Sequence, residues 1–260
     1  MQHSAWYTIL FAAAVCVICA ILVSTSAVSL FDQQQANILL DKRKNVLLAA
    51  GILKPEEIAS AREINARFAT VKAVVIDLQS GDAAPEVDAA SFDQQKAKAD
   101  PVMGRVAPPN DAGIKRLPNQ AVVYQVMSSQ GEVEMIVLPV EGYGLWSTLY
   151  GFLALDADTK TIRGLTYYQH GETPGLGGEV DNPAWKALWP GRIAFDDQWV
   201  PAIRVIKGKA GAPGEDPHQV DGLSGATLTS RGVTSMLRFW LGENGFAPYL
   251  AKFREGRKVS

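Results

Sequence analysis

Residues 121–138, AVVYQVMSSQGEVEMIVL, contain two runs of strand-forming residues on either side of the polar turn SSQG. In the second run, apolar residues alternate with Glu132 and Glu134, which is the period of a strand with one apolar face. Two further strand candidates follow, STLYGFLAL (147–155) and TIRGLTYYQ (161–169), joined by the polar turn DADTK. Strands joined by such tight turns pair antiparallel. The sequence therefore predicts a mainly antiparallel sheet.

Helices and additional strands flank these two hairpins. Helices are predicted over 33–48, 55–68 and 183–189, strands over 71–78 and 200–206, and an exposed excursion over 80–109. A last helix after residue 227 has one apolar face, formed by Val233, Met236, Leu237, Trp240 and Leu241. Helices followed by hairpin-linked strands with interspersed helices are typical of an α+β fold with flanking helices.

The N-terminal segment is apolar enough to cross a membrane. No charged residue precedes Asp32, and the 22 residues from Tyr7 to Val28 would extend about 33 Å as a helix. A cleaved signal peptide is the alternative, but no Lys or Arg precedes the apolar run, which is also longer than usual. We therefore expect residues 1–31 to be a single transmembrane anchor that contacts the lipid bilayer.

The anchor leaves residues 32–260 as one domain, with 32–70 as a helical lead-in and 71–260 as the α+β core. The basic triplet at 42–44 weakly favours a cytoplasmic location for this domain. Long domains, however, cross membranes largely regardless of such charges. Charge alone therefore leaves the side of the membrane open.

Composition excludes several classes of function. The net charge of −2 provides no basic stripe for nucleic acid. The two cysteines, Cys16 and Cys19, both lie in the apolar segment, where they either pack as small residues or have a redox or iron-binding role with a partner. The three histidines are too few for a zinc site, so no metal site is predicted. No catalytic set is recognisable, and a bound cofactor that brings its own chemistry remains open.

Three glycine-rich loops are the candidate binding elements: GYGLW (142–146), HGETPGLGG (170–178) and DGLSGAT (221–227). Each could singly be a turn, and the third could be a helix cap formed by Thr227 or Thr229. Together they would let the backbone approach a flat or phosphorylated ligand closely.

The third loop resembles a known attachment signature. Asp221, Ser224, Gly225, Ala226 and Thr227 are similar to the motif at which a separate flavin transferase attaches FMN, through its phosphate, to threonine. With the anchor, GYGLW and ETPGLG, the whole chain resembles the covalent-FMN-binding subunits of membrane electron-transport enzymes. These are the C-type subunits of the Na+-translocating NADH:quinone reductase and the G-type subunits of the Rnf complex. The GYGLW loop and the long N-terminal region favour the C-type subunits of the Na+-translocating NADH:quinone reductase.

The resemblance implies a cofactor and a site. FMN would be bound covalently by a phosphoester to Thr227. The residues themselves offer Lys207 or Arg231 as a counter-charge for that phosphate. The residues implied to line the flavin are Leu145, Trp146, Glu172, Thr173, Leu176 and Gly177.

The resemblance also implies a role and a location. The chain would relay electrons from NADH toward quinone, coupled to Na+ export, among other subunits of a bacterial inner-membrane enzyme. Its flavin domain would lie in the periplasm, and the chain alone would have no NADH site. Two alternatives are the G-type subunit of an Rnf-type ion-translocating ferredoxin:NAD oxidoreductase, and an anchored scaffold without a redox role in which the loops are merely turns.

Overall fold

The computed structural model describes residues 4–256, and its contacts divide the chain into two units between Lys42 and Arg43. The first unit consists of most of one helix. The second contains the sheet and every other element.

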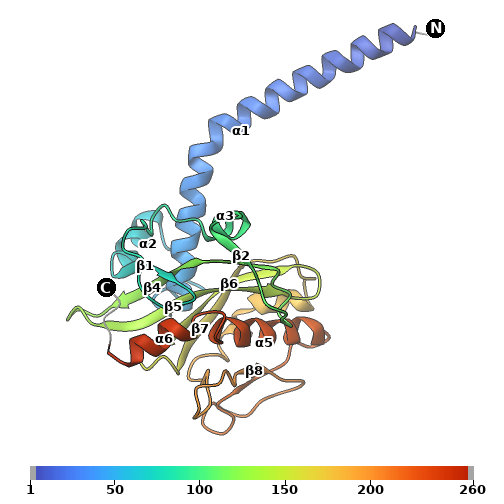
Figure 1. The fold of residues 1–260 in the computed structure, drawn as a ribbon. Helices are drawn as coiled ribbons and strands as arrows, with labels where there is room; N and C mark the ends of the chain where they lie inside the picture. Colours follow the sequence, from blue (N-terminus) through green and yellow to red (C-terminus); the bar gives the residue numbers. More distant parts are fainter. Residues whose placement is uncertain (1–3, 257–260) are drawn as a thin grey trace. The chain divides into compact units, whose positions relative to one another are not determined.

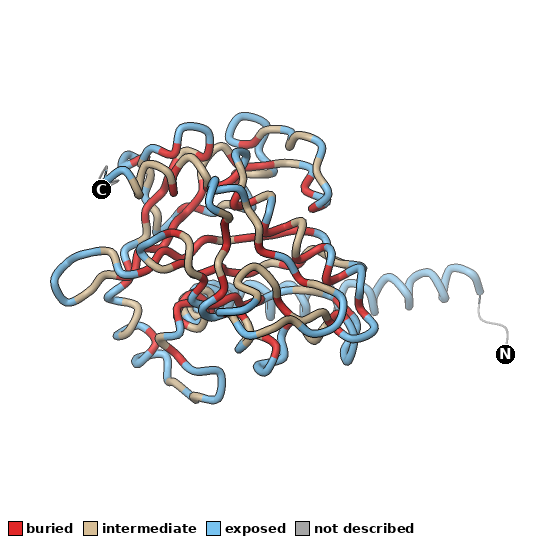
Figure 2. The backbone as a smooth tube through the Cα atoms, turned by 90° about the horizontal axis from the view of Figure 1, so that it is seen from below, coloured by how far each residue is buried: buried red, intermediate tan, exposed pale blue. Residues whose placement is uncertain are grey.

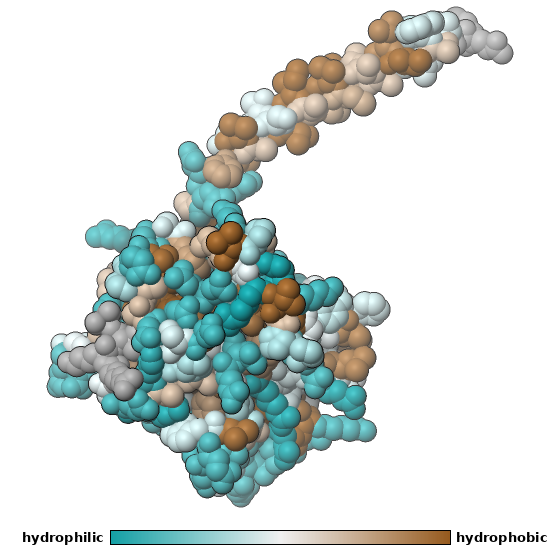
Figure 3. All heavy atoms as spheres, in the orientation of Figure 1, coloured by the Kyte–Doolittle hydropathy of each residue, from teal (hydrophilic) through white to brown (hydrophobic). Residues whose placement is uncertain are grey.

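Helix α1 (Ala5–Ala49) is continuous, so the predicted span and the predicted helix over 33–48 form one element. The reason is visible in its sequence, because no glycine or proline occurs between its ends. Its most apolar window has a mean hydropathy of 2.6, and the helix is long and apolar enough to cross a bilayer. Apolar side chains cover the N-terminal part of α1 in Figure 3.

Five antiparallel strands form the main sheet, in the order β1-β4-β5-β6-β7 (Figure 1). These strands are β1 (Val71–Asp77), β4 (Gln120–Met127), β5 (Val133–Tyr143), β6 (Thr148–Asp156) and β7 (Ile162–Gln169). Both predicted hairpins are present, with Gln125 opposite Ile136 and Leu153 opposite Leu165. The predicted α+β class and antiparallel sheet are therefore confirmed.

Both faces of the sheet are covered. On one face, α5 (Thr227–Leu241) and α6 (Ala247–Arg254) pack on the core, and the side-chain amide of Gln125 donates a hydrogen bond to the Tyr249 hydroxyl at 3.0 Å. On the other face, Phe68 at the end of α2 (Ala61–Phe68) meets Tyr124 edge-on, and the end of α1 lies against Gly164. Buried residues accordingly follow the central strands in Figure 2.

Three predicted boundaries are wrong. Helix α2 begins at Ala61 rather than at 55, because Ser60 and Glu63 form a capping box that fixes the start. The helix predicted over 183–189 is only α4 (Pro183–Lys186), preceded by the 3-10 helix η1 (Gly177–Asp181). The strand predicted over 200–206 is reduced to β8 (Arg204–Val205), parallel to β9 (Gln219–Val220), since Pro201 has no N–H to donate.

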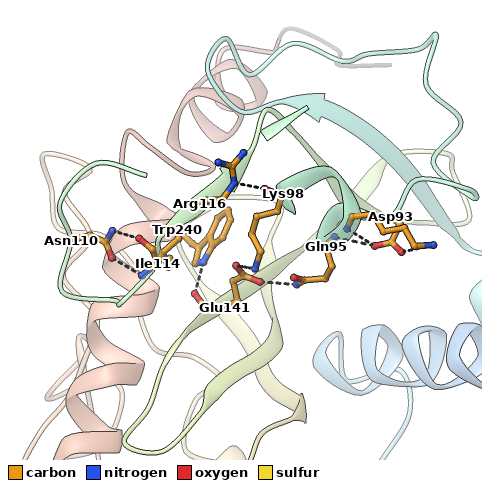
Figure 4. A network of polar contacts seen from close by, with 9 residues as sticks. Asp93, Gln95, Lys98, Asn110, Ile114, Arg116, Glu141 and Trp240 are labelled. Carbon is orange, nitrogen blue, oxygen red and sulfur yellow. Dashed lines mark hydrogen bonds and ion pairs between the residues drawn. The ribbon is translucent and has the colours of Figure 1, made fainter. Parts of the chain in front are cut away.

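Most of the segment 80–109 is exposed, as predicted, but it contains regular structure that its composition does not predict. It contains α3 (Gln94–Ala99) and β2 (Gly104–Val106), which pairs with β3 (Arg116–Pro118). The buried carboxylate of Glu141 on β5 accepts hydrogen bonds from Lys98 at 2.6 Å and Gln95 at 2.7 Å (Figure 4). The indole N–H of Trp240 on α5 also donates to the Glu141 carbonyl at 2.7 Å. Glu141 thus ties α3 and α5 to the same point of the sheet.

Candidate functional site

The three glycine-rich loops meet around one buried carboxylate, that of Glu172, which is 5% exposed. It accepts the backbone N–H groups of Leu145, Trp146 and Ser147 at 3.1, 2.9 and 3.1 Å. It also accepts the hydroxyl of Thr229, in the first turn of α5, at 2.7 Å. One side chain from the second loop therefore holds the first loop and the helix that follows the third.

Glycine is required at two positions beside this carboxylate. A Cβ added to Gly144 would lie 2.6 Å from a Glu172 carboxylate oxygen. A Cβ added to Gly177 would lie 2.5 Å from the other oxygen and 2.6 Å from the Thr229 hydroxyl. These distances are shorter than van der Waals contact, so side chains there would push the loops apart.

Hydrogen bonding keeps Glu172 ionised. Burial raises the pKa of its carboxyl, because a charge is costly to desolvate. The hydrogen bonds from the Thr229 hydroxyl and from the N–H groups of Trp146, Leu145 and Ser147 favour the charged form, and together they outweigh burial. The pKa of Glu172 therefore lies below its ordinary value, and the site contains a fixed negative charge at neutral pH.

Thr227 is the first residue of α5 and is exposed. Among residues 4–256 its hydroxyl has no hydrogen-bond partner, and the preceding Ala226 provides no side-chain cap. The predicted alternative, in which Thr227 or Thr229 caps the helix, is therefore wrong. Gly225 has a φ of +70°, a left-handed conformation that glycine adopts easily, and a Cβ there would lie 2.9 Å from Leu176. The second and third loops are thus adjacent at this point.

Several large apolar side chains of these loops face solvent. Trp146 is 66% exposed, Leu228 52% and Leu176 44%, and Leu145 is also exposed. They come from the first two loops and from the first turn of α5, and Glu172 holds the backbone of the first loop and the Thr229 side chain of α5. Large apolar side chains gathered on a surface are typical of a place that a ligand or partner covers.

The remaining predicted residues support the loops or lie at their edge. Asp221 accepts the N–H of Ala210 at 2.9 Å, and its carbonyl accepts the indole N–H of Trp185 at 2.9 Å. Ser224 and Thr173 are exposed. Lys207 is exposed in the segment whose next residue, Gly208, accepts the N–H of Gly222 at 2.8 Å.

The two residues predicted as a counter-charge lie on different elements, with Arg231 in α5 and Lys207 two residues after β8. Arg231 lies one turn beyond Thr227 on α5 and lines a groove of about 640 Å³ along that helix. Within residues 4–256, Lys207 does not line this groove, whereas Arg204 and Arg238 do. The sequence did not single out these two arginines, although the spacing of Arg231 and Arg238 on the predicted helix is a usable signal.

We expect Gly232→Ala to destabilise the domain. Helix propensity alone favours alanine by about 1 kcal/mol. The added Cβ would instead collide with the carbonyl oxygen of Tyr143, because α5 packs directly on the backbone at the end of β5. We expect the free energy of unfolding to fall by about 1–3 kcal/mol, measured by thermal unfolding. Gly214→Ala is the control, since its Cβ meets nothing within 4 Å, and equal stability of the two variants would contradict this packing.

Comparison with known proteins agrees with this arrangement. Residues 144–242 match the family of the FMN-binding domain. This range contains the first loop from Gly144 onward and the whole of the second and third loops. The fold and site therefore define an FMN-binding domain that follows an apolar helix.

Relatives that align over nearly the whole chain identify its family more narrowly. The chain is 49% identical to the C-type subunit of the Na(+)-translocating NADH-quinone reductase of Yersinia pestis, over 96% of this chain and 93% of that one. It is 46% identical to the corresponding protein of Pseudomonas aeruginosa, over 98% of both chains. The crystal structure of NqrC from Shewanella oneidensis superposes with a TM-score of 0.75 at 36% identity, covering 82% of this chain and 96% of that one. The chain belongs to the NqrC family of the Na(+)-translocating NADH-quinone reductase, which confirms the first of the two related families favoured from the sequence.

Proposed function

We propose that this chain is the FMN-carrying electron-transfer subunit of a Na+-translocating NADH:quinone reductase, with FMN attached by a phosphoester to the hydroxyl of Thr227. The observation that carries the proposal is the position of that hydroxyl. It is exposed and without a partner among the described residues, at the uncapped start of α5 and beside the joined loops. Its relatives' names and the match to the FMN-binding domain support the cofactor and the enzyme.

The start of α5 suits a phosphate. No side chain caps this helix, and within residues 4–256 the backbone N–H groups of Thr227, Leu228 and Thr229 have no hydrogen-bond acceptor. Free N–H groups and the positive end of the helix dipole favour an anion at this place. Arg231, one turn further along, supplies a positive charge on the same side of the helix. We assign the phosphate to these groups, with Lys207 at the edge of the site.

The exposed apolar side chains suit a flavin ring. Leu145, Trp146 and Leu176 would cover the ring, while Thr173 and nearby backbone groups would meet its polar edge. Glu172 would act through the loops that it holds, since its carboxylate is already occupied by donors from the chain. Gly177 and Gly225 let the second and third loops approach closely, and Asp221, Ser224 and Ala226 complete the attachment loop.

FMN, when bound, supplies the electron-transfer chemistry, and the chain supplies position and electrostatics. We place the oxidation of NADH, the reduction of quinone and the export of Na+ in the other subunits of the complex, between which this chain is a relay. A separate flavin transferase would form the phosphoester. We further propose residues 1–31 as an anchor in a bacterial inner membrane and residues 32–260 as a periplasmic domain. α1 has the length and hydropathy for such an anchor.

The direct test is denaturing gel electrophoresis of the full chain co-expressed with a flavin transferase. Flavin fluorescence should migrate with the polypeptide, and mass spectrometry should find one FMN, less one water, on the peptide that contains Thr227. A polypeptide band without fluorescence, or a flavin on another residue, would reject the assignment. A colourless band under these conditions is what the scaffold alternative predicts.

We expect the purified, flavinylated chain to oxidise no NADH when it is separated from the other subunits. The reason is that the proposed role uses only the flavin and its surrounding loops. The measurement is the absorbance of NADH with an artificial electron acceptor, and the intact complex is the positive control. Sustained NADH oxidation by the chain alone would contradict the relay.

A further inference from the structure

The groove along α5 is lined by three arginines from two elements: Arg231 and Arg238 of α5, and Arg204 of β8. Over residues 4–256 the guanidinium groups of these three arginines form no hydrogen bond or ion pair, although the backbone N–H of Arg204 donates to the His218 carbonyl at 2.9 Å. All three are exposed. Asp111 is also among the lining residues. A positive groove of about 640 Å³ therefore lies beside a helix of a chain whose net charge is −2.

The groove begins at the proposed flavin site. Gly144 and Leu145 of the first loop and Leu228 of α5 contribute to its lining. Along α5, Arg231 and Arg238 follow Thr227 by four and eleven residues, which keeps all three on one side of the helix. At a rise of about 1.5 Å per residue, Arg238 lies about 16 Å along the axis from Thr227. The arginines thus extend well beyond the place assigned to the phosphate.

The length of the groove means that the three arginines cannot all bind one phosphate at Thr227. Arg231 is near enough to Thr227 to face a phosphate attached there. Arg238 lies about 10 Å further along the axis, and Arg204 comes from a different element, so neither is accounted for by the attachment site. Guanidinium groups bind carboxylates through paired hydrogen bonds, and arginine is frequent at the energetic centre of protein interfaces. Exposed guanidinium groups that share one groove attract an anionic partner, and salt screens that attraction.

We propose that this groove is the docking site for an acidic, carboxylate-rich segment of a partner subunit. This inference rests on the proposed function, because that function supplies both the partner subunits and the flavin at one end of the groove. Carboxylates of the segment would pair with Arg204 and Arg238, and the segment would run toward Leu145 and Leu228. Docking in this position would place the partner beside the flavin loops. Charge complementarity of this kind guides association and orientation.

The test uses the full chain in its detergent-solubilised complex, with Arg204→Glu and Arg238→Glu made singly and together. Arg231 is left unchanged because it belongs to the proposed phosphate site. Arg62→Glu is the matched control, since Arg62 is exposed near the start of α2 and lies outside the groove. For each variant, retention of the chain in the complex is measured against salt concentration, and covalent flavin is measured by in-gel fluorescence.

We expect each groove variant to keep its flavin and to bind the complex about tenfold more weakly, as loss of a charged interface contact does. Binding of the unsubstituted chain should weaken as salt rises, and binding of the double variant should depend less on salt. Arg62→Glu should behave as the unsubstituted chain. Loss of covalent flavin in the groove variants would overturn the proposal, because the groove would then belong to the cofactor site. Unchanged retention at every salt concentration would also overturn it.

A second measurement identifies the occupant. A photo-crosslinking benzoylphenylalanine is placed at Ser235, which lines the groove between Arg231 and Arg238. The purified complex is then irradiated, and the crosslinked peptide is sequenced by mass spectrometry. An aspartate- and glutamate-rich peptide of another subunit supports the proposal. Crosslinks only to lipid, or to a peptide without excess negative charge, reject it. If the gel test had shown no flavin on Thr227, a crosslink to an acidic subunit would show that the docking site stands without the proposed cofactor role.

Discussion

Replacing Thr227 by valine is expected to abolish covalent flavin while leaving the fold intact. Valine keeps the branched shape of threonine but lacks the hydroxyl that would form the phosphoester. Thr227 is exposed, and its hydroxyl has no partner among the described residues, so the free energy of unfolding should change by less than about 0.5 kcal/mol. In-gel fluorescence should fall to background, and thermal unfolding of the flavin-free proteins should be unchanged.

Thr227→Ser is the matched control, because serine keeps a hydroxyl at the same position. We expect this variant to retain covalent flavin at a reduced level, since serine lacks the methyl group that restricts the side chain. A Thr227→Val chain that stays fluorescent after denaturation would show that the flavin is attached elsewhere. Loss of fluorescence accompanied by unfolding would contradict the exposed position of this side chain.

Replacing Glu172 by glutamine should loosen all three loops together. The amide has a similar shape but only one oxygen, which can keep the three N–H groups that now bind Oε1. The NH₂ group then replaces Oε2, which now accepts the Thr229 hydroxyl and shares the N–H of Leu145. A hydrogen bond to a charged acceptor contributes about 1 kcal/mol more than one to a neutral acceptor, so each of these bonds is weakened, and the contact at Oε2 is lost or reversed. We expect the free energy of unfolding to fall by about 2–4 kcal/mol, and covalent flavin to decrease. Thermal unfolding and in-gel fluorescence measure the two effects, and Glu132→Gln, at an exposed glutamate, is the control.

The effect of Glu172→Gln should depend on pH in a defined direction. The pKa of Glu172 is lowered in the folded protein, so the ionised group stabilises the fold at pH values above its unfolded pKa. That stabilisation is lost as the pH falls through the folded pKa, below the ordinary value of 4.5. Glutamine does not titrate. The difference in melting temperature between the two proteins should therefore be largest at neutral pH and shrink in acid, and a constant difference would contradict the assigned charge.

The sheet was predictable because its signals are local. Each hairpin lies within about twenty residues, with strand-forming runs on both sides of a polar turn, and the observed registers follow that pattern. The segment 80–109 was not predictable in the same way. Its order depends on Glu141, more than forty residues away, which holds Lys98 and Gln95 from inside the core. Composition alone makes such a segment look like an exposed loop.

In the candidate site, too, the residues in local motifs were predictable and the contacts between distant residues were not. The loops and Thr227 could be selected from glycine content and motif, and Glu172 was selected as a residue that lines the flavin. Its role in holding the loops comes from a contact with Thr229, 57 residues along the chain, and from backbone donors that no side-chain pattern reveals. Arg204 was missed for a similar reason: it lines the groove because β8 lies against α5, where the N–H of Val205 donates to the Thr234 hydroxyl at 3.0 Å.

If the flavin lies where the proposed function places it, the way Glu172 holds the first loop makes that loop a place where the redox potential can be adjusted. The carboxylate binds the N–H groups of Leu145 and Trp146 and leaves their side chains unused for holding the loop. Substitutions at these two positions would therefore change the polarity and solvent access of the proposed flavin site without moving the backbone. A series of Trp146 variants, titrated potentiometrically, would show how far the midpoint potential of the carrier can be shifted on an unchanged scaffold.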